Sequence, residues 1–357
     1  MTGSREFDRW RGISFALIAA LLFGASTPLA KSLLPQVSPV LMAGLLYLGS
    51  GVGLGIYRLI RSRTNAVGSR EAALTRKDLP WLAGAIISGG MIGPVLLLWG
   101  LAATPASSAS LLLNLEGVLT AVLAWFVFKE NFDARIALGM ALIAAGGVCV
   151  SWSGRPEVGL PWGSFAIIGA CLAWALDNNL TRKVSAGDPV QIAMLKGLVA
   201  GSVNTILAFT LGAKLPAVPA LLATSVVGFF GYGVSLTLFV LALRYIGTAR
   251  TGAYFSIAPF VGAVISILFL GDMLTISFVV ASVLMGLGVW LHLTERHKHA
   301  HRHEPMEHEH LHSHDVHHQH AHDTTDPGSE PHSHGHRHEE LVHSHPHFPD
   351  IHHRHGH

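Results

Sequence analysis

The stretch GISFALIAALLFGASTPLAKS, residues 12–32, decides what kind of protein this chain forms. It is apolar throughout except for small polar residues and Lys31 near its end. A bilayer core of about 30 Å is crossed by about 20 such residues in a helix. Because lipid cannot satisfy exposed backbone groups, a segment of this kind must be helical there. The stretch therefore predicts a membrane-spanning helix. Read alone, it also resembles a secretory signal peptide, but its later recurrence as a span argues against cleavage.

That recurrence lies in the stretch GSFAIIGACLAWALDNNLTRKV, residues 163–184. At an offset of 151 the two segments pair Phe23 with Trp174 and Lys31 with Arg182. Identities are few, so the likeness depends on the order of spans and on the polar residues at equivalent places. The chain is therefore expected to contain two related halves.

A second alignment extends the duplication toward the end of each half. Residues 101–148 match residues 243–290 at an offset of 142, which places Glu130 over Asp272. Each half then holds five apolar runs, and an odd number forces the second half to insert upside down. Inverted repeats of this kind are common in secondary transporters.

We predict an all-α membrane protein with ten transmembrane helices in a 5+5 inverted repeat, followed by a disordered tail. The expected spans are residues 13–34, 39–57, 79–102, 105–128, 135–152, 162–181, 190–211, 219–243, 249–270 and 275–293. The expected divisions are an N-terminus at 1–11, repeats at 12–152 and 161–293, a linker at 153–160 and a cytoplasmic tail at 296–357.

The charges predict the orientation through the positive-inside rule. With the N-terminus in the cytoplasm, fifteen Lys and Arg residues flank the spans on the cytoplasmic side, against three outside, Lys31, Arg155 and Lys214. An even number of spans returns the C-terminus to the cytoplasm. We therefore expect a multi-pass inner-membrane protein with both termini inside.

Composition excludes several other classes of protein. Only 13% of the residues are charged, against about 25% in soluble domains. No basic face is interleaved with aromatic residues, so nucleic-acid binding is not expected. Both cysteines, Cys149 and Cys171, lie in apolar runs, which argues against a disulfide framework. The body of the chain offers no nucleophile paired with a base. An enzyme is therefore not expected, and no catalytic residue is predicted.

Four segments carry a resemblance to a known family: Phe23–Lys31, Trp174–Lys183, residues 107–131 and residues 251–273. As an ordered set they resemble the EamA-type exporters of the drug/metabolite transporter superfamily, over residues 12–293. The chain departs from the family pattern where Gly117 replaces a proline and Ala258 replaces an acid. The resemblance implies an inner-membrane carrier with a central site between two repeats. It does not identify the substrate, because the family exports amino acids, nucleosides, drugs and other metabolites.

Three ionisable residues fall within the spans, namely Glu116, Asp177 and Lys196. Such groups are costly in a bilayer and usually face a cavity or a partner. Glu116, beside Asn114, is our candidate coupling group, since burial favours the neutral acid and would let it carry a proton. The alternative is a structural Glu116 that is hydrogen-bonded to a neighbouring helix.

The remaining candidates for a substrate or coupling site are Asp177, Asn178, Lys196 and Pro28. Asp177 could instead form an interfacial charge cluster with the basic residues one turn later. Lys196 could reach the headgroups along its own stem, or pair with one of the acids. Pro28 could break its helix and expose carbonyl groups to substrate.

All 24 histidines lie between His292 and His357, in clusters where they recur at every second residue. Imidazole suits Zn²⁺, Cu²⁺, Ni²⁺ and Co²⁺, so the tail is expected to bind a divalent metal, Ni, Co or Zn. Its scarcity of apolar residues predicts disorder in the free state. The candidate metal ligands are His297, His299, His301, His303, His308, His310, His312, His314, His332, His334, His336 and His338.

Two functions follow from these features. The first hypothesis is efflux of a divalent cation, Ni²⁺ or Co²⁺ and then Zn²⁺, by alternating access with proton exchange. The second is a metabolite or drug exporter whose tail only buffers or senses metal; a pH-sensing tail and a membrane-anchored metal-binding protein are more distant alternatives. The absence of histidine from residues 1–291 counts against metal cargo. No tightly bound cofactor is expected. The expected partners are the lipid bilayer and a small-molecule or metal-ion substrate, and the sequence leaves a homodimer open.

Overall fold

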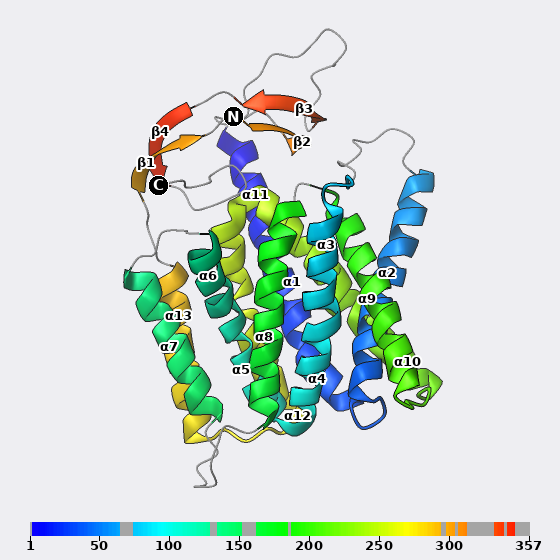
Figure 1. The fold of residues 1–357 in the computed structure, drawn as a ribbon. Coiled ribbons are helices and arrows are strands. Elements are labelled where there is room, and N and C mark those ends of the chain that lie inside the picture. Colours follow the sequence, from blue (N-terminus) through cyan, green and yellow to red (C-terminus); the bar gives the residue numbers. More distant parts are fainter. Residues whose placement is uncertain are drawn as a thin grey trace.

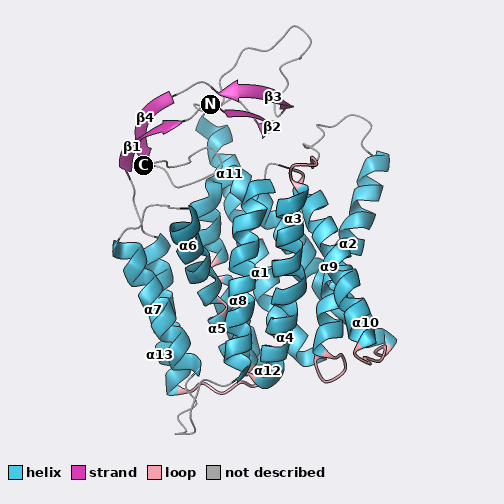
Figure 2. Ribbon diagram, viewed as in Figure 1, coloured by secondary structure: helices cyan, strands magenta, loops and turns pink. Residues whose placement is uncertain are grey.

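The computed structural model describes residues 2–64, 74–128, 134–151, 162–184, 187–293, 298–303, 306–312, 332–338 and 341–346. Its body is a bundle of helices that run roughly parallel to one axis (Figure 1). The four strands lie at the end of the bundle where α1 begins (Figure 2). The linker expected at residues 153–160 lies outside the described residues.

Every predicted apolar run falls on helical backbone. The helices are α1 (Thr2–Leu33), α2 (Pro39–Thr64), α3 (Leu79–Ala85), η1 (Ile86–Ile92), α4 (Gly93–Ala103), α5 (Ala106–Leu112), α6 (Asn114–Phe128), α7 (Ala134–Ser151), α8 (Trp162–Thr181), η2 (Arg182–Val184), α9 (Pro189–Thr210), α10 (Val218–Gly228), η3 (Phe229–Val234), α11 (Ser235–Phe255), α12 (Ala258–Leu270) and α13 (Ile276–Leu293). Of these, η1 and η3 are π-helical and η2 is a 3₁₀ turn.

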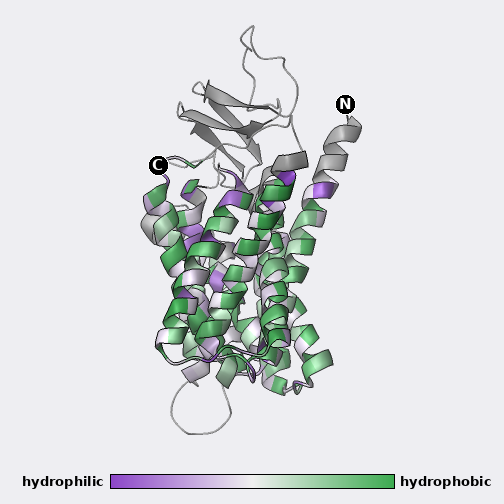
Figure 3. Cartoon of the chain, turned by 90° about the vertical axis from the view of Figure 1, so that its right-hand side faces the viewer, coloured by the Kyte–Doolittle hydropathy of each residue, from purple (hydrophilic) through white to green (hydrophobic). Residues whose placement is uncertain are grey.

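The bundle belongs in a membrane. Six of the described segments are long and apolar enough to cross a bilayer by themselves: Trp10–Leu33, Pro39–Arg61, Leu79–Ala103, Ala106–Leu123, Pro189–Thr210 and Val218–Ala242. Shorter apolar helices cover residues 137–151, 258–270 and 276–291. Hydrophobic residues cover most of the bundle's length, and hydrophilic ones gather toward the end that carries the N-terminus (Figure 3).

The packing of the helices is duplicated. Helix α1 packs against α11 and α12, and α8 packs in the same way against α4 and α6. The two remaining major pairs, α2 with α9 and α7 with α13, each join helices from the two halves of the sequence. The contacts of α1 with α11 and α12 thus have counterparts in those of α8 with α4 and α6.

The element boundaries repeat as well. Segment η1 ends at Ile92 and η3 ends at Val234, which are 142 positions apart. Helix α13 begins and ends 142 positions after α7. Because π-helical turns are rare and mostly occur at functional places, their recurrence at equivalent positions indicates a shared architecture.

One expected loop is helical in backbone but still reverses the chain. Helix α11 continues through residues 244–248, where the sequence predicts a connection. Sixteen residues of straight helix would separate Phe239 from Phe255 by about 24 Å. Their ring centroids instead lie 4.8 Å apart. The chain therefore reverses its direction within α11. The last part of this helix and α12 together make up the span expected at residues 249–270.

Small residues allow the helices of the two halves to approach closely. A Cβ atom on Gly51 of α2 would overlap the backbone at Gly197 and Leu198 of α9, and one on Gly197 would overlap Gly51. Contacts of this type are typical of membrane helix interfaces. Gly51 and Gly197 therefore let α2 and α9 pack backbone against backbone.

The tail contains paired strands. Strand β1 (Lys298–His303) pairs antiparallel with β4 (Leu341–Pro346), and β2 (Met306–His312) pairs antiparallel with β3 (His332–His338). The prediction of a disordered tail is not confirmed for these residues. Two of the candidate ligands, His297 and His314, lie outside the described residues.

Candidate functional site

The π-helical segment η1 creates a carbonyl group that its own helix cannot satisfy. The amide of Gly93 donates to Ser88 in the π register, and the next residue, Pro94, has no N–H. The Gly89 carbonyl therefore lacks a donor from these two residues. A buried carbonyl in this position needs a partner from elsewhere.

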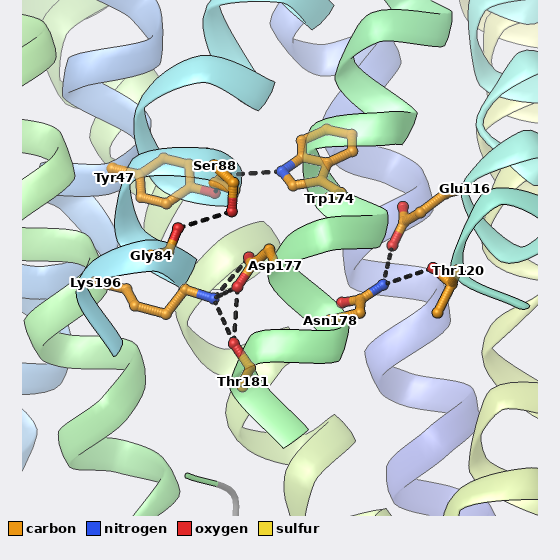
Figure 4. Close-up of polar contacts among 11 residues, drawn as sticks. Tyr47, Gly84, Ser88, Glu116, Thr120, Trp174, Asp177, Asn178, Thr181 and Lys196 are labelled. Atoms are coloured by element: carbon orange, nitrogen blue, oxygen red, sulfur yellow. Dashed lines mark hydrogen bonds and ion pairs between the residues drawn. The ribbon is translucent and has the colours of Figure 1, made fainter. Parts of the chain in front are cut away.

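Two aromatic side chains supply that partner from other helices (Figure 4). The Tyr47 hydroxyl of α2 donates to the Gly89 carbonyl at 2.7 Å, and the indole N–H of Trp174 on α8 donates to it at 2.9 Å. The amide of Asn204 on α9 donates to the next carbonyls, Gly90 at 3.2 Å and Met91 at 3.4 Å. Three helices thus hold η1 in place.

An ion pair lies directly beside this segment. Lys196 Nζ of α9 lies 2.6 Å from Oδ1 and 2.7 Å from Oδ2 of Asp177 on α8, and both residues are buried. The Thr181 hydroxyl donates to Asp177 Oδ1 at 2.7 Å. A Cβ atom on Gly89 would overlap the Asp177 carboxylate, so glycine is required where η1 passes the pair.

This geometry corrects two of the alternatives drawn from sequence. The partner of Asp177 is Lys196 of a neighbouring helix, in place of the predicted cluster with the basic residues that follow on its own helix. Lys196 does not reach toward the headgroups, because its side chain is only 7% exposed. The sequence also left open a pairing of Lys196 with one of the acids, and its pairing with Asp177 is the contact that forms.

Glu116 forms a second polar contact on the opposite side of α8 (Figure 4). Asn178 Nδ2 donates to Glu116 Oε1 at 2.8 Å and to the Thr120 hydroxyl at 3.4 Å. Glu116 is half-buried and Asn178 is exposed. Consecutive residues of α8 therefore serve the two contacts, Asp177 toward α9 and Asn178 toward α6.

A cluster of aromatic rings lies next to this polar region. Phe23 of α1 packs against Trp174, Tyr232 and Phe255, with centroid distances of 6.2, 5.9 and 5.5 Å. Tyr47 also contacts Tyr232, at 5.4 Å. The rings come from α1, α2, α8, η3 and α11, so the cluster occupies the place where the two halves meet.

The structure separates the remaining predicted site residues from this cluster. Asn114 is buried, and its amide donates to Leu111 and contacts the sulfur of Met285 on α13. Pro28 is buried within α1, and the described contacts of the polar cluster do not include it. Neither belongs to the group formed by Glu116, Asp177, Asn178 and Lys196.

Sequence reasoning missed several residues of the site. Tyr47 and Asn204 are essential to η1, but nothing in their local sequence marks them, because the carbonyls they satisfy arise from the π register. Thr120 was not singled out because its partner, Asn178, lies on another helix, and Thr181 was not singled out although it donates to Asp177 one turn earlier on its own helix. The one local signal is Pro94 after Gly89–Gly93, which indicates an irregular helix.

The described residues offer no ready metal centre. Among them, no three His, Cys, Asp or Glu side chains are grouped to hold an ion. The Asp177 carboxylate already accepts from an ammonium group, which would repel a divalent cation. Glu116 contributes one carboxylate beside an amide and a hydroxyl. The site in the bundle is therefore better suited to hydrogen bonding and proton exchange than to metal coordination.

With this site described, comparison with known proteins identifies the family. The model of the EamA-like transporter family matches residues 10–152 and again residues 161–294. The chain belongs to the EamA-like transporter family. It is therefore a multi-pass membrane transporter, as its apolar helices indicate.

Relatives of this EamA-like transporter support the assignment without naming a substrate. An uncharacterized transporter of Methanothermobacter thermautotrophicus is 30% identical over 297 residues, which is 79% of this chain and 85% of the relative. The uncharacterized transporter YyaM of Bacillus subtilis is 26% identical, covering 76% and 89%. The uncharacterized inner membrane transporter YedA of Escherichia coli is 24% identical, covering 71% and 80%.

A solved crystal structure shares the fold. It superposes with a TM-score of 0.59 at 17% sequence identity, covering 78% of this chain and 95% of the other. At this identity the likeness concerns the arrangement of helices alone.

Proposed function

We propose that this chain exports a small organic solute across the inner membrane by alternating access, with Glu116 as the proton-carrying group. The observation that carries the proposal is the Glu116–Asn178 hydrogen bond beside the Asp177–Lys196 pair. Aromatic rings border these groups where the two halves meet. Binding sites for organic molecules combine such aromatic surfaces with a few placed polar groups.

The transport unit in this proposal is a ten-helix inverted repeat. The duplicated packing of α1 and α8, the matched π-helical segments and the twofold match to the family model all support it. The distribution of Lys and Arg supports an orientation with both termini in the cytoplasm. In that orientation, the end of the bundle that carries the tail faces the cytoplasm.

The test of the proton role is Glu116→Gln in liposomes that contain a pH-sensitive dye. Single amino acids, nucleosides and organic amines are added outside, and the internal pH is followed. We expect at least one solute to drive proton movement through the parent protein and none through Glu116→Gln. The amide still accepts from Asn178, so the variant should remain folded. Undiminished proton movement in Glu116→Gln would contradict the proposal.

Divalent-cation efflux, ranked first from the sequence, becomes the second candidate. The observation that favours it is the 24-histidine tail. The ion pair at Asp177 and the lack of a metal-ligating group among the described residues of the bundle count against it. Organic cargo is therefore the function that the geometry supports best.

Whole-cell metal content separates the two candidates. Ni, Co, Zn and Cu are measured in an efflux-deficient bacterial host that expresses the full chain, Glu116→Gln or residues 1–295. A metal exporter would lower one metal, lose this effect in Glu116→Gln and lose apparent affinity on truncation. For an organic exporter we expect no lowering of any metal, and solute transport that is indifferent to the truncation.

For the tail we propose binding of Ni²⁺, Co²⁺ or Zn²⁺ as a buffer or sensor. Support comes from the register of its strands, in which histidines stand opposite histidines. The paired positions are His299 with His345, His301 with His343, His308 with His336, His310 with His334 and His312 with His332. Directly opposite residues of an antiparallel pair lie about 4.5–5.5 Å apart at Cα, a separation that one ion bound by two imidazoles can bridge.

Titration of the full chain in detergent with each metal tests this second proposal. We expect several ions per chain, and loss of most of this binding when residues 296–357 are removed. Substituting His308, His310 and His312 with Asn should remove more binding than substituting His352, His353 and His355, which lie outside the described strands. Equal losses from both sets would contradict the role of the register.

A further inference from the structure

The two ends of the bundle are packed differently. At the end away from the tail, a Cβ atom on Gly262 of α12 would overlap the Ser110 side chain of α5 and the Gly24 carbonyl of α1. The equivalent of Ser110 in the second half, 142 positions later, is Gly252. A Cβ atom on Gly252 meets none of the described atoms within 4 Å, and the same holds for Gly117.

This difference identifies a closed end and an open end. Helix α5 packs against α12 and α1, whereas the corresponding surface around Gly252 stands apart from the other described residues.

Two charged side chains fasten the closed end across helices. Lys31, in the last turn of α1, donates from Nζ to the carbonyls of Leu101, Ala102 and Thr104 at the end of α4. These carbonyls are among the last of their helix and have few partners within it. A cation at a helix C-terminus is also favoured by the helix dipole.

Asp272 makes a second contact at the break between α4 and α5, on the side of α5. Its Oδ2 accepts the amide of Ser107, at the start of α5, at 2.8 Å. Asp272 reaches this amide because Gly271 adopts a φ of 70°, which turns the chain sharply at the end of α12. The Lys31 ammonium and the Asp272 carboxylate also attract each other.

We propose that Lys31 and Asp272 form a clamp that holds the extracytoplasmic end of the transporter shut, and that this clamp must release for the substrate to leave. The clamp joins the α4–α5 corner to α1 and α12, so its release frees that corner to separate from them. The proposal rests on the orientation given above. In the alignment of the two repeats, Lys31 matches Arg182 and Asp272 matches Glu130.

The test uses a cysteine at Ser110, which is 1% exposed in the closed packing. Ser110→Cys is expressed in right-side-out membrane vesicles and labelled with a membrane-impermeant maleimide, and the parent without this change measures the background from Cys149 and Cys171. Adding Lys31→Gln or Asp272→Asn should raise the labelling rate about tenfold, the order expected when the hydrogen bonds of a charged group become those of a neutral one. This readout needs no substrate, so it stands apart from the identity of the cargo.

Lys214→Gln is the matched control, because Lys214 is an exposed lysine in a connection at the same end of the bundle. We expect it to leave labelling unchanged, and Lys31→Arg to stay near the parent rate. If Lys31→Gln fails to elute as a folded species on size-exclusion chromatography, Asp272→Asn decides. Parent-like labelling in folded Asp272→Asn would overturn the clamp, and a rise seen only in inside-out vesicles would overturn its assignment to the extracytoplasmic end.

Discussion

The two halves of the molecule share one architecture but differ in chemistry at their equivalent places. Helix α8 carries Asp177 and Asn178, whereas the matching positions of α1 hold Ser26 and Thr27. Both pairs belong to helices with the same neighbours in the duplicated packing. The backbone therefore follows a common arrangement, and of these two equivalent places only the one on α8 carries a charge.

The same difference extends to the helices that face α1 and α8. Glu116 of α6 has Ala258 of α12 as its counterpart, and Lys196 of α9 has Leu46 of α2, which is fully buried. Segment η1 is held by hydrogen bonds from side chains, whereas in η3 the ring of Tyr232 packs against Phe23 of α1. The duplicated scaffold thus contains a polar half, built from η1, α6, α8 and α9, and an aromatic half, built from η3, α12, α1 and α2. Each of these two halves takes elements from both repeats. This division indicates that the scaffold is maintained by packing and that function depends on a few substituted positions.

The largest change in stability should come from removing one partner of the ion pair in the polar half. Lys196→Met leaves Asp177 buried without its cation, so we expect the free energy of unfolding to fall by about 3–5 kcal/mol. The measurement is an SDS titration in mixed micelles, with Lys214→Met as the control at an exposed lysine. Unchanged stability of Lys196→Met would contradict the buried pair.

Copying the aromatic half into the polar half sharpens this test. The double variant Asp177→Ser with Lys196→Leu installs the residues found at Ser26 and Leu46. Replacing a buried ion pair by packed neutral residues is often neutral for stability. We therefore expect most of the loss of stability seen in Lys196→Met to be recovered in the same SDS titration.

A smaller effect is expected where η1 passes the ion pair. Gly89→Ala would force a Cβ atom into the Asp177 carboxylate, at a cost of about 1–3 kcal/mol for overpacking. Gly117→Ala is the matched helical control, because its Cβ meets none of the described atoms within 4 Å, and removing a helical glycine should stabilise by about 0.5–1 kcal/mol. Equal effects of the two variants would show that the contact at Gly89 has no energetic weight.

The smallest single effects should come from the two donors to the Gly89 carbonyl. Tyr47→Phe and Trp174→Phe each remove one hydrogen bond, and the Tyr47→Phe change should cost about 0.5–1.5 kcal/mol. With both donors removed, the carbonyl is left without either described partner, so the double variant should lose more than the sum of the singles. A double-mutant cycle measures this excess. Strict additivity would mean that another group satisfies the carbonyl.

The sequence predicted much of this molecule because lipid imposes simple requirements. Apolar runs of about 20 residues determine where helices lie, and the alignment of Lys31 with Arg182 revealed the duplication. The scarcity of charge within the spans singled out Glu116, Asp177 and Lys196, all of which make polar contacts in the structure. Rare residues in a costly environment are informative by themselves.

The partners of those residues could not be predicted. Asp177 and Lys196 lie 19 positions apart on different helices, and which faces meet depends on the packing of the whole bundle. The roles of Tyr47 and Asn204 depend on a π register that periodicity does not report. Asn114 lies apart from the polar cluster because neighbours in sequence on a helix need not share a face: it is buried against α13, while Glu116 contacts α8.

The composition of the polar site has an evolutionary consequence. Gly89 and Glu116 come from the first repeat, and Asp177 and Lys196 come from the second. An ancestor of half this length could not have built the site from a single copy. It would have needed two copies inserted in opposite directions in the same membrane. After gene fusion, each copy would have had to function in only one of the two orientations. Only after that could the second copy acquire Asp177 and Lys196, while the first kept Ser26 and Leu46 at the equivalent positions and supplied Glu116.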